Sequence, residues 1–440
     1  MAQLIYSADV YADTEITWTD EGQPTFFIKG KNLGSLPTLF DKEGRFIEEV
    51  NSYFFYLKNI KKLKDINSNA RALLKFWSFI EENELSWNHF PPLKRLKSTY
   101  LFRSYLLTEI EKGSISQSTS NTYINHIKNF YLWAIHEGLL QVKNDQCAPF
   151  KIETVKIINT GILAHLRPAF TVDTSDLRIR VEKDSQTKKI RALTPLSIES
   201  LTLLTQHLPR FSIEFQLQCL LAIQMGLRIQ EVSTLTVEAI NTAVPLTESK
   251  YRYEIVIGPS TGVRTKNNKT RQIEISVEFL AKIRNYLISE RRLVRLNKLH
   301  EKIRAIKKGE VILKKEKLDI FMHCEKFEPL FISEQGNPVD KSVIGSRWGE
   351  LRHVIRNKNS SFSYRFHDLR STYGTYRLND LLEAGIQPLE SLELLMGWMG
   401  HINETTTWKY LRFLKRKEVF IEKFGTLDSI MHEAIGVGNE

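Results

Sequence analysis

The sequence predicts a mainly α protein in which a helical domain precedes a mixed, mostly helical domain with a small antiparallel sheet. Three observations predict this fold class. Apolar residues recur at helical spacing through most of the chain. Two short stretches after residue 250 are instead typical of paired strands. The 440 residues also exceed what one hydrophobic core usually organises.

The first helical domain is expected over residues 45–143. Residues 1–44 are rich in Thr, Gly and Pro, and we expect short strands or irregular structure there, as an N-terminal extension whose role the sequence leaves open. The clearest helix of the domain follows the N-cap candidates Ser116 to Thr119 and stops near Gly138. Apolar residues at helical spacing indicate its four helices around 46–57, 73–80, 100–110 and 123–134.

Residues 144–189 are expected to be a linker, because they hold two prolines and a long polar run. The second domain is expected over 190–425, followed by a tail, 426–440. Thr194 is expected to cap its first helix, with Pro195 as the first helical residue. Two strands, Tyr253–Ile257 and Gln272–Ser276, are predicted to pair across the basic loop 258–271.

The formal net charge of +11 favours a polyanionic partner, because each Lys or Arg near a phosphate releases condensed counterions. The densest cluster lies between Lys282 and Lys317, with 13 Lys or Arg against 4 Glu. Apolar residues keep helical spacing there, which predicts a helix or helical hairpin. Its cations form either a solvated helix face or a surface that follows a DNA backbone, and the sequence leaves both open.

Cysteine spacing and hydropathy exclude several classes of protein. Cys147, Cys219 and Cys324 are widely separated, so we expect neither a disulfide framework nor a metal site. The first residues lack a basic segment followed by an apolar run, and no stretch of about 18 apolar residues is present. We therefore expect a cytoplasmic protein without a membrane span.

Isolated arginines in apolar surroundings are candidates for holding a phosphate. Transfer of a phosphodiester without a metal needs a nucleophile, cations for the non-bridging oxygens and a proton donor for the leaving oxygen. Guanidinium suits the second task because its planar fork contacts two oxygens at once. Arg228 follows an apolar stretch in which Gly226 is expected to break a helix, and Glu231 could pair with it. The alternative is a buried Arg–Glu pair that only joins two elements.

Two further groups carry residues suited to this chemistry. His367 and Arg370 at i and i+3 on a helix face the same way and can reach one phosphate. His401 is followed nine positions later by Tyr410. A phenol, with a pKa of about 10, is a weak nucleophile unless neighbouring cations stabilise its anion. Each residue alone is more often an ordinary polar contact, but together they indicate a phosphate-transfer site.

In this order, the segments resemble the tyrosine recombinase (phage integrase) family. The resemblance covers about 191–425, and residues 45–143 look like that family's core-binding domain. The basic segment 282–317 looks like an insertion. The matching segments are Gly226–Glu231, His367–Arg370, Met399–His401 with the tyrosine at 410, and Lys266–Ile273, which is similar to the family's β-hairpin lysine motif.

The resemblance implies a C-shaped clamp on double-stranded DNA and a role for each matching residue. Arg228 and Arg370 would hold the scissile phosphate, with Glu231 orienting the first. Lys266, or less favourably Lys269, would protonate the leaving 5′ oxygen. His367 would assist proton transfer, His401 would donate a hydrogen bond to the phosphate, and Tyr410 would form a 3′-phosphotyrosyl bond. Further DNA contacts are expected from Lys269, Arg271, Arg291, Arg292 and Arg295.

The resemblance also implies partners and leaves alternatives open. It implies a synaptic tetramer on DNA, accessory DNA-bending proteins, association with the nucleoid, a role in moving or resolving a mobile element, and no cofactor. A type IB topoisomerase-like enzyme, a catalytically silent DNA-binding regulator and a helical RNA- or protein-binding scaffold are the alternatives. All six catalytic positions are filled, which weighs against the regulator, and the ordered motifs weigh against the scaffold.

Overall fold

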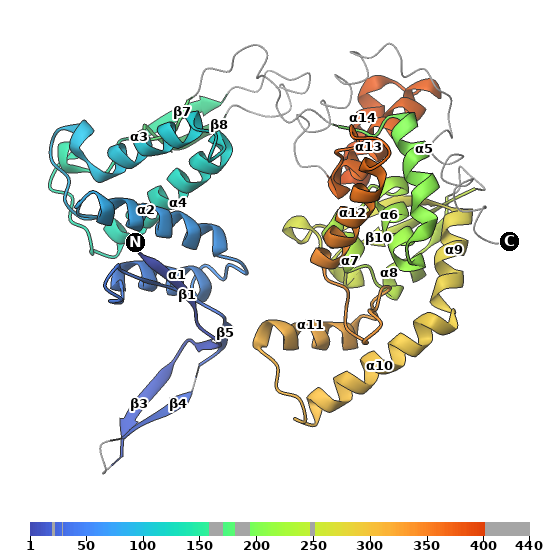
Figure 1. The fold of residues 1–440 in the computed structure, drawn as a ribbon, viewed down its shortest axis with the longest axis horizontal. Helices are drawn as coiled ribbons and strands as arrows, with labels where there is room; N and C mark the ends of the chain where they lie inside the picture. Colours follow the sequence, from blue (N-terminus) through green and yellow to red (C-terminus); the bar gives the residue numbers. More distant parts are fainter. Residues whose placement is uncertain (20–22, 29, 158–169, 181–193, 247–250, 401–440) are drawn as a thin grey trace. The chain divides into compact units, whose positions relative to one another are not determined.

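The computed structural model describes residues 1–19, 23–28, 30–157, 170–180, 194–246 and 251–400. The described elements are mainly helices with small antiparallel sheets, which confirms the predicted fold class. The chain divides into two compact units, Met1–Lys188 with Lys314–Glu316, and Lys189–Leu313 with Lys317–Glu440. Figure 1 labels the α-helices of each unit.

The first unit is built around the four predicted helices. Helices α2 and α4 pack together, and Phe76, Phe130 and Tyr131 are fully buried in their shared core. Ser116 caps α4 by accepting a hydrogen bond from the Thr119 N–H at 3.1 Å, and Gly138 follows the helix end with φ +74°. The helices are α1 (Glu48–Asn59), α2 (Asn67–Glu82), α3 (Ser98–Glu111) and α4 (Gln117–His136).

The residues before α1 form short antiparallel strands that partly join the helical core. Leu36 and Leu39 are buried among the helices, and Asn51 of α1 bonds both the N–H and the carbonyl of Leu39, at 2.7 and 2.9 Å. A boundary at residue 44 therefore does not separate two packing units. The strand pairs are β1 (Gln3–Tyr6) with β6 (Pro37–Phe40), β2 (Val10–Tyr11) with β5 (Asn32–Gly34), and β3 (Thr14–Trp18) with β4 (Pro24–Ile28).

The segment expected to be a linker also adds to the first unit. Strands β7 (Ile152–Ile157) and β8 (Phe170–Ser175) form an antiparallel hairpin. After β8, Leu177 and Ile179 are buried in the helical core, and Asn121 of α4 bonds the N–H and the carbonyl of Ile179 at 3.0 and 3.2 Å. The linker prediction is therefore wrong for the described residues of this segment, because their apolar side chains complete the core.

The second unit has its core between α6, α13 and a three-stranded sheet in the order β11–β10–β9. The predicted hairpin is confirmed, and each strand begins one residue earlier than predicted. The strands are β9 (Val244–Pro245), β10 (Arg252–Ile257) and β11 (Arg271–Ser276). The helices from α5 onward are α5 (Ile198–His207), α6 (Ile213–Gln224), α7 (Ile229–Ser233), α8 (Val237–Asn241), α9 (Val277–Leu287), α10 (Glu290–Lys307), α11 (Lys315–Lys326), α12 (Lys341–Arg356), α13 (Phe366–Glu383) and α14 (Pro388–Met399).

The first helix of this unit begins later than predicted. Helix α5 starts at Ile198, and Ser197, not Thr194, caps it by accepting a hydrogen bond from the Ser200 N–H at 3.3 Å. The N–H of Leu196 instead donates to Thr372 Oγ1 of α13 at 2.9 Å. This tertiary contact holds the residues before Ser197 against α13, so Pro195 does not open the helix.

The described residues hold no candidate for a membrane-spanning helix or for a metal site. None of the helices there is both long and apolar enough to cross a bilayer. No group of three or more His, Cys, Asp or Glu side chains in the same residues is placed to hold a metal ion.

Candidate active site

A tight turn after α6 places Arg228 at the start of α7. Helix α6 ends at Gln224, and Gly226 has φ +64°, a left-handed conformation that glycine adopts without strain. A Cβ on Gly226 would lie 2.4 Å from Cδ1 of the buried Tyr373 ring. Both the conformation and the available space therefore require glycine. The helix break predicted at Gly226 is confirmed, and the Arg228 side chain remains 22% exposed.

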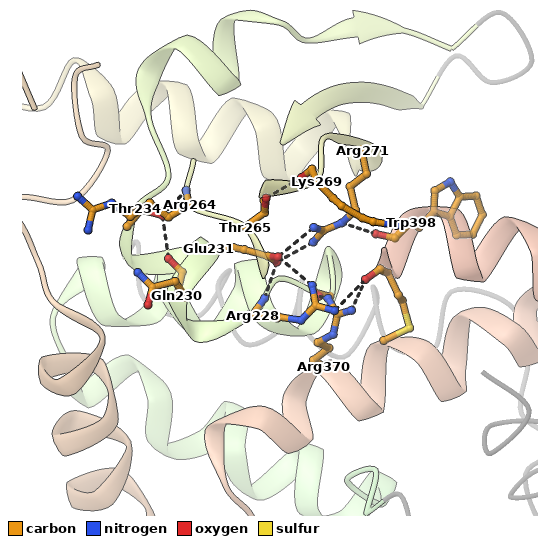
Figure 2. A network of polar contacts seen from close by, with 12 residues as sticks. Arg228, Gln230, Glu231, Thr234, Arg264, Thr265, Lys269, Arg271, Arg370 and Trp398 are labelled. Carbon is orange, nitrogen blue, oxygen red and sulfur yellow. Dashed lines mark hydrogen bonds and ion pairs between the residues drawn. The ribbon is translucent and has the colours of Figure 1, made fainter. Parts of the chain in front are cut away.

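The carboxylate of Glu231 lies between two guanidinium groups. It accepts hydrogen bonds from the backbone N–H and from Nη1 of Arg228, both at 2.9 Å. It also accepts hydrogen bonds from Nη1 and Nη2 of Arg271, at 2.9 and 2.6 Å. Figure 2 shows Glu231 between these two arginines. The contact between Arg228 and Glu231 that the sequence suggested is present, and Arg271 is a second partner.

These contacts keep Glu231 ionised. Burial alone would raise the pKa of Glu231, because a charge in the protein interior is poorly solvated. The hydrogen bonds and charge of Arg271, the charge of Arg370 and the Arg228 N–H outweigh burial and lower the pKa to about 2. Since three arginines face one carboxylate, this cluster of four side chains carries two positive charges in excess.

Helix α13 brings Arg370 into the same cluster. Arg370 is only 2% exposed, and its guanidinium donates hydrogen bonds to the carbonyls of Gly226 and Met399. Nη2 of Arg228 donates to the same Met399 oxygen at 3.4 Å. Two guanidinium groups from distant parts of the sequence therefore meet at one oxygen at the end of α14 (Figure 2).

This geometry is suited to holding a phosphate group. The last carbonyls of a helix carry a partial negative charge and lack partners within the helix, so Met399 O attracts cationic donors. Arginine N–H groups that meet at such an acceptor are also oriented to bind the non-bridging oxygens of a phosphodiester. Fixed cations at that position would stabilise the charge that develops during transfer of the phosphoryl group.

The lysine motif lies on the turn that joins β10 to β11. Asn267 and Asn268 have φ +62° and +52°, the pattern of a turn with two left-handed central residues. Thr265 Oγ1 donates to the Lys269 carbonyl at 2.6 Å, which closes the turn. Lys266 and Lys269 flank the two asparagines, and both lysines are exposed.

The remaining predicted catalytic residues lie at or beyond the edge of the described site. His367 is exposed on α13, one turn before the buried Arg370. His401 and Tyr410 lie outside the described residues, which end at Gly400. The structure thus brings together Arg228, Glu231 and Arg370.

Three of the arginines that we expected to contact DNA are bonded within the protein. The side chain of Arg271 is 7% exposed and bonds Glu231. Arg292 is 2% exposed and donates to Glu328 at 2.6 Å and to three carbonyls. Arg295 is 7% exposed and donates to Glu214 at 2.7 Å and to one carbonyl. For these three arginines, a structural role within the protein therefore replaces the predicted contact with DNA. DNA contact by the exposed residues Lys269 and Arg291 stays a prediction.

The basic segment 282–317 folds as helices, as predicted, and uses many of its cations internally. Nζ of Lys298 donates to the Glu334 carbonyl at 3.1 Å. Nζ of Lys302 donates to Asn337 Oδ1 at 2.6 Å, and Lys307 pairs with Glu325. Arg291 is paired with Glu214 as well. These cations are thus bonded to their own domain, an arrangement that neither of the two interpretations described, and DNA contact by the rest of the segment stays a prediction.

Sequence reasoning missed the inward orientation of Arg271, although the pattern of β11 contains the signal. Side chains two residues apart on a strand point to the same face. Ile273 and Ile275 are buried, so Arg271 shares their inward face. In the same way, Arg292 and Arg295 lie on the buried face of α10 with Leu299. The carbonyl oxygens of Gly226 and Met399 gave no signal, because every residue has one.

A mainly helical fold, with arginines from two helices at one oxygen and a hairpin that carries lysines, is the arrangement expected of a tyrosine recombinase. A sequence model described as the Phage integrase family matches residues 191–416, more than half of the chain. This chain belongs to the phage integrase family. The match includes Arg228, Lys266, Arg370 and Tyr410.

Solved structures of recombinases match this chain at low sequence identity. XerH site-specific recombinase bound to its palindromic difH substrate is 15% identical, with a TM-score of 0.46 over 85% of this chain and 84% of that chain. The Tn1549 transposon integrase in complex with a circular intermediate DNA is 16% identical, with a TM-score of 0.46 over 82% and 98%. A lambda integrase dimer bound to a COC′ core site is 14% identical, with a TM-score of 0.42 over 85% and 96%. No curated protein matches the sequence.

Proposed function

We propose that this protein cuts and rejoins DNA at specific sites through a 3′-phosphotyrosyl intermediate on Tyr410. The observation that carries the proposal is the meeting of Arg228 and Arg370 at one acceptor oxygen, beside the ionised Glu231. Cations held in this way can bind the two non-bridging oxygens of a scissile phosphate and stabilise its transition state.

In the proposed first step, the phenol oxygen of Tyr410 attacks the phosphorus. The bond from phosphorus to the 5′ oxygen breaks, and Lys266 gives a proton to that oxygen. His367 takes the phenol proton, and His401 donates a hydrogen bond to the phosphate. In the second step, the 5′-hydroxyl of another strand gives its proton to Lys266 and attacks the phosphotyrosine, and the tyrosine leaves and regains its proton from His367. Since one phosphoester replaces another, the cycle needs no ATP.

The proposed substrate is double-stranded DNA held in a C-shaped clamp by the helical core-binding unit and the catalytic unit. Strand exchange between two sites would take four copies, with accessory DNA-bending proteins assisting. We propose that the exchange moves or resolves a mobile element and that the protein works in the cytoplasm, with the nucleoid. Its excess of Lys and Arg, +11 over the chain, supports a DNA partner.

A duplex selected by the protein itself provides the test. The Tyr410→Phe variant is used to select its binding site from a random-sequence duplex pool. A nick in the selected duplex near the cleaved phosphate then allows the cut end to diffuse away and traps the adduct. We expect the wild-type protein to form a covalent adduct whose modified peptide contains Tyr410, and Tyr410→Phe to bind the duplex equally well without forming it.

Four results would contradict this proposal or its details. An adduct on another residue, or no adduct with any selected duplex, would reject the nucleophile. Normal cellular function of the Tyr410→Phe variant, which lacks the nucleophile, would favour a catalytically silent DNA-binding regulator. Relaxation of any supercoiled plasmid by a monomer, without joining to a second duplex, would favour a topoisomerase-like enzyme.

A further inference from the structure

We infer that Arg271 is a positioning residue for DNA cleavage, which holds the end of α14 and the carboxylate of Glu231 in place and thereby orients Arg228 and Arg370. The inference rests on the proposed function and assigns Arg271 a role in it that involves no contact with DNA.

Arg271 joins three elements through its guanidinium. It extends from the first residue of β11, and its Nε donates to the carbonyl of Trp398 in α14 at 2.8 Å. Its Nη1 and Nη2 donate to the two carboxylate oxygens of Glu231 in α7. All three nitrogens therefore have acceptors within the protein, and Figure 2 shows this arrangement. With a side chain 7% exposed, Arg271 is poorly placed to reach a DNA phosphate.

One contact of Arg271 fixes the oxygen at which the other arginines meet. Trp398 O and Met399 O belong to successive peptide groups at the end of α14. Because the peptide groups of a helix are rigidly linked, fixing one of these carbonyls fixes the other. The contact between Arg271 and Glu231 also holds Arg228 in place, because Glu231 bonds both the backbone and the side chain of Arg228.

Arg271 also packs against the residue that ends α14. Gly400 has φ +58°, the left-handed conformation of a helix C-cap. A Cβ on Gly400 would lie 2.9 Å from Cδ of Arg271. Gly400 directly precedes His401 in the sequence, and the backbone at Gly400 sets the direction in which the chain leaves α14. The side chain of Arg271 therefore packs against the C-cap of α14, the residue that precedes His401 in the sequence.

The test compares Arg271→Gln and Arg271→Lys in the full-length protein, with the nicked duplex selected as above. Because a misplacement of about 1 Å can cost about a hundredfold in rate, we expect Arg271→Gln to lower the single-turnover rate constant by roughly tenfold to a hundredfold. The Kd for the duplex and its dependence on salt should not change. Lysine can reach Glu231 or the Trp398 carbonyl but not both, so Arg271→Lys should restore part of the rate.

A pH profile adds a second readout. Without Arg271, Glu231 loses the main group that opposes its burial, so its pKa rises. We therefore expect cleavage by Arg271→Gln to fall at an acidic pH at which the rate of the wild-type protein is still constant. A purely structural defect would instead lower the amount of adduct without changing the rate constant or the shape of the pH profile.

Arg252→Gln is the matched control. Arg252 lies in β10 of the same sheet and pairs with Glu274 at 3.4 Å, so its loss also removes an ion pair from the hairpin. This variant should cleave at the wild-type rate. A wild-type rate constant for Arg271→Gln overturns the inference. So does weaker DNA binding with a salt slope lower by about one, which indicates a direct phosphate contact. If the wild-type protein forms no adduct at Tyr410, the proposed function fails first, and the two failures are distinguishable.

Discussion

Arg228 and Arg370 donate hydrogen bonds to one acceptor, the main-chain carbonyl oxygen of Met399. One side chain extends from the turn before α7 and the other from α13, so only the folded core brings them together. The shared acceptor shows that both guanidinium groups can address the same oxygen. In the proposed function, the two arginines would likewise donate to one scissile phosphate.

The Arg370→Lys variant tests the geometry of this pair. The guanidinium of Arg370 bridges the carbonyls of Gly226 and Met399, and a lysine ammonium cannot reproduce two fixed, coplanar donors. We expect the single-turnover cleavage rate to fall about a hundredfold or more, while the Kd for the selected duplex changes by less than about tenfold. Cleavage by Arg370→Lys at the wild-type rate would show that only the charge matters at this position.

Glu231→Gln is expected to lower stability in a way that depends on pH. The pKa of Glu231 in the folded protein, about 2, lies below its ordinary value of 4.5. The stabilisation from this carboxylate is therefore fully present above about pH 4.5 and is lost as the pH falls towards 2. At pH 7 we expect Glu231→Gln to lower the free energy of unfolding by roughly 3 kcal/mol, because a buried pair loses one partner.

Thermal unfolding of the wild-type and Glu231→Gln proteins measures this difference from pH 7 down to pH 3. The gap between their Tm values should narrow as the pH falls. A gap that stays constant across this range would mean that the ionised carboxylate does not stabilise the fold. Glu254→Gln, at a half-buried position of β10, provides a control with the same change of charge.

The sequence predicted the fold class, the hairpin and the Arg228 turn because each leaves a local pattern. Gly226 interrupts an apolar helix, and Arg228 stands alone after it. The partners of the Arg271 side chain lie in α7 and α14, and no local sequence pattern predicts these contacts. The charge of Arg292 and Arg295 suggested DNA, but their carboxylate partners come from elsewhere in the chain. Charge alone did not distinguish a cation that binds DNA from one that binds its own domain.

Gly226→Ala is predicted to disturb the site through the backbone. Alanine would have to adopt the left-handed φ of +64°, and its Cβ would lie only 2.4 Å from the Tyr373 ring. We expect a loss of at least about 2 kcal/mol in the free energy of unfolding, measured by urea denaturation. Gly345→Ala on the exposed face of α12 is the control, because nothing lies within 4 Å of its Cβ. That change should stabilise the protein by roughly 0.5 kcal/mol.

Arg292→Ala distinguishes a structural arginine from one that contacts DNA. Its guanidinium is buried and bonds Glu328 and three carbonyls, so we expect the free energy of unfolding to drop by roughly 3 kcal/mol. The salt dependence of DNA binding, measured below the Tm, should not change. Lys269→Ala should do the opposite, leaving stability unchanged and lowering the salt slope by about one. A reduced salt slope for Arg292→Ala would restore the original DNA-binding prediction.

The choice between Lys266 and Lys269 as proton donor can be decided by changing the leaving group. Both lysines are exposed beside the same turn, so their position alone does not separate them. With an oxygen leaving group, loss of the general acid should slow cleavage by about a hundredfold or more. If sulfur replaces the bridging 5′ oxygen, the leaving group is a thiolate. The corresponding thiol has a pKa of about 8.5, so the thiolate needs no proton to leave. We therefore expect Lys266→Ala to cleave the oxygen duplex slowly and the sulfur duplex at the wild-type rate, whereas Lys269→Ala cleaves both at nearly normal rates.

Equal slowing of Lys266→Ala on both duplexes would make this lysine a phosphate-binding cation. Rescue of a slow Lys269→Ala variant by sulfur would instead assign the role of general acid to Lys269.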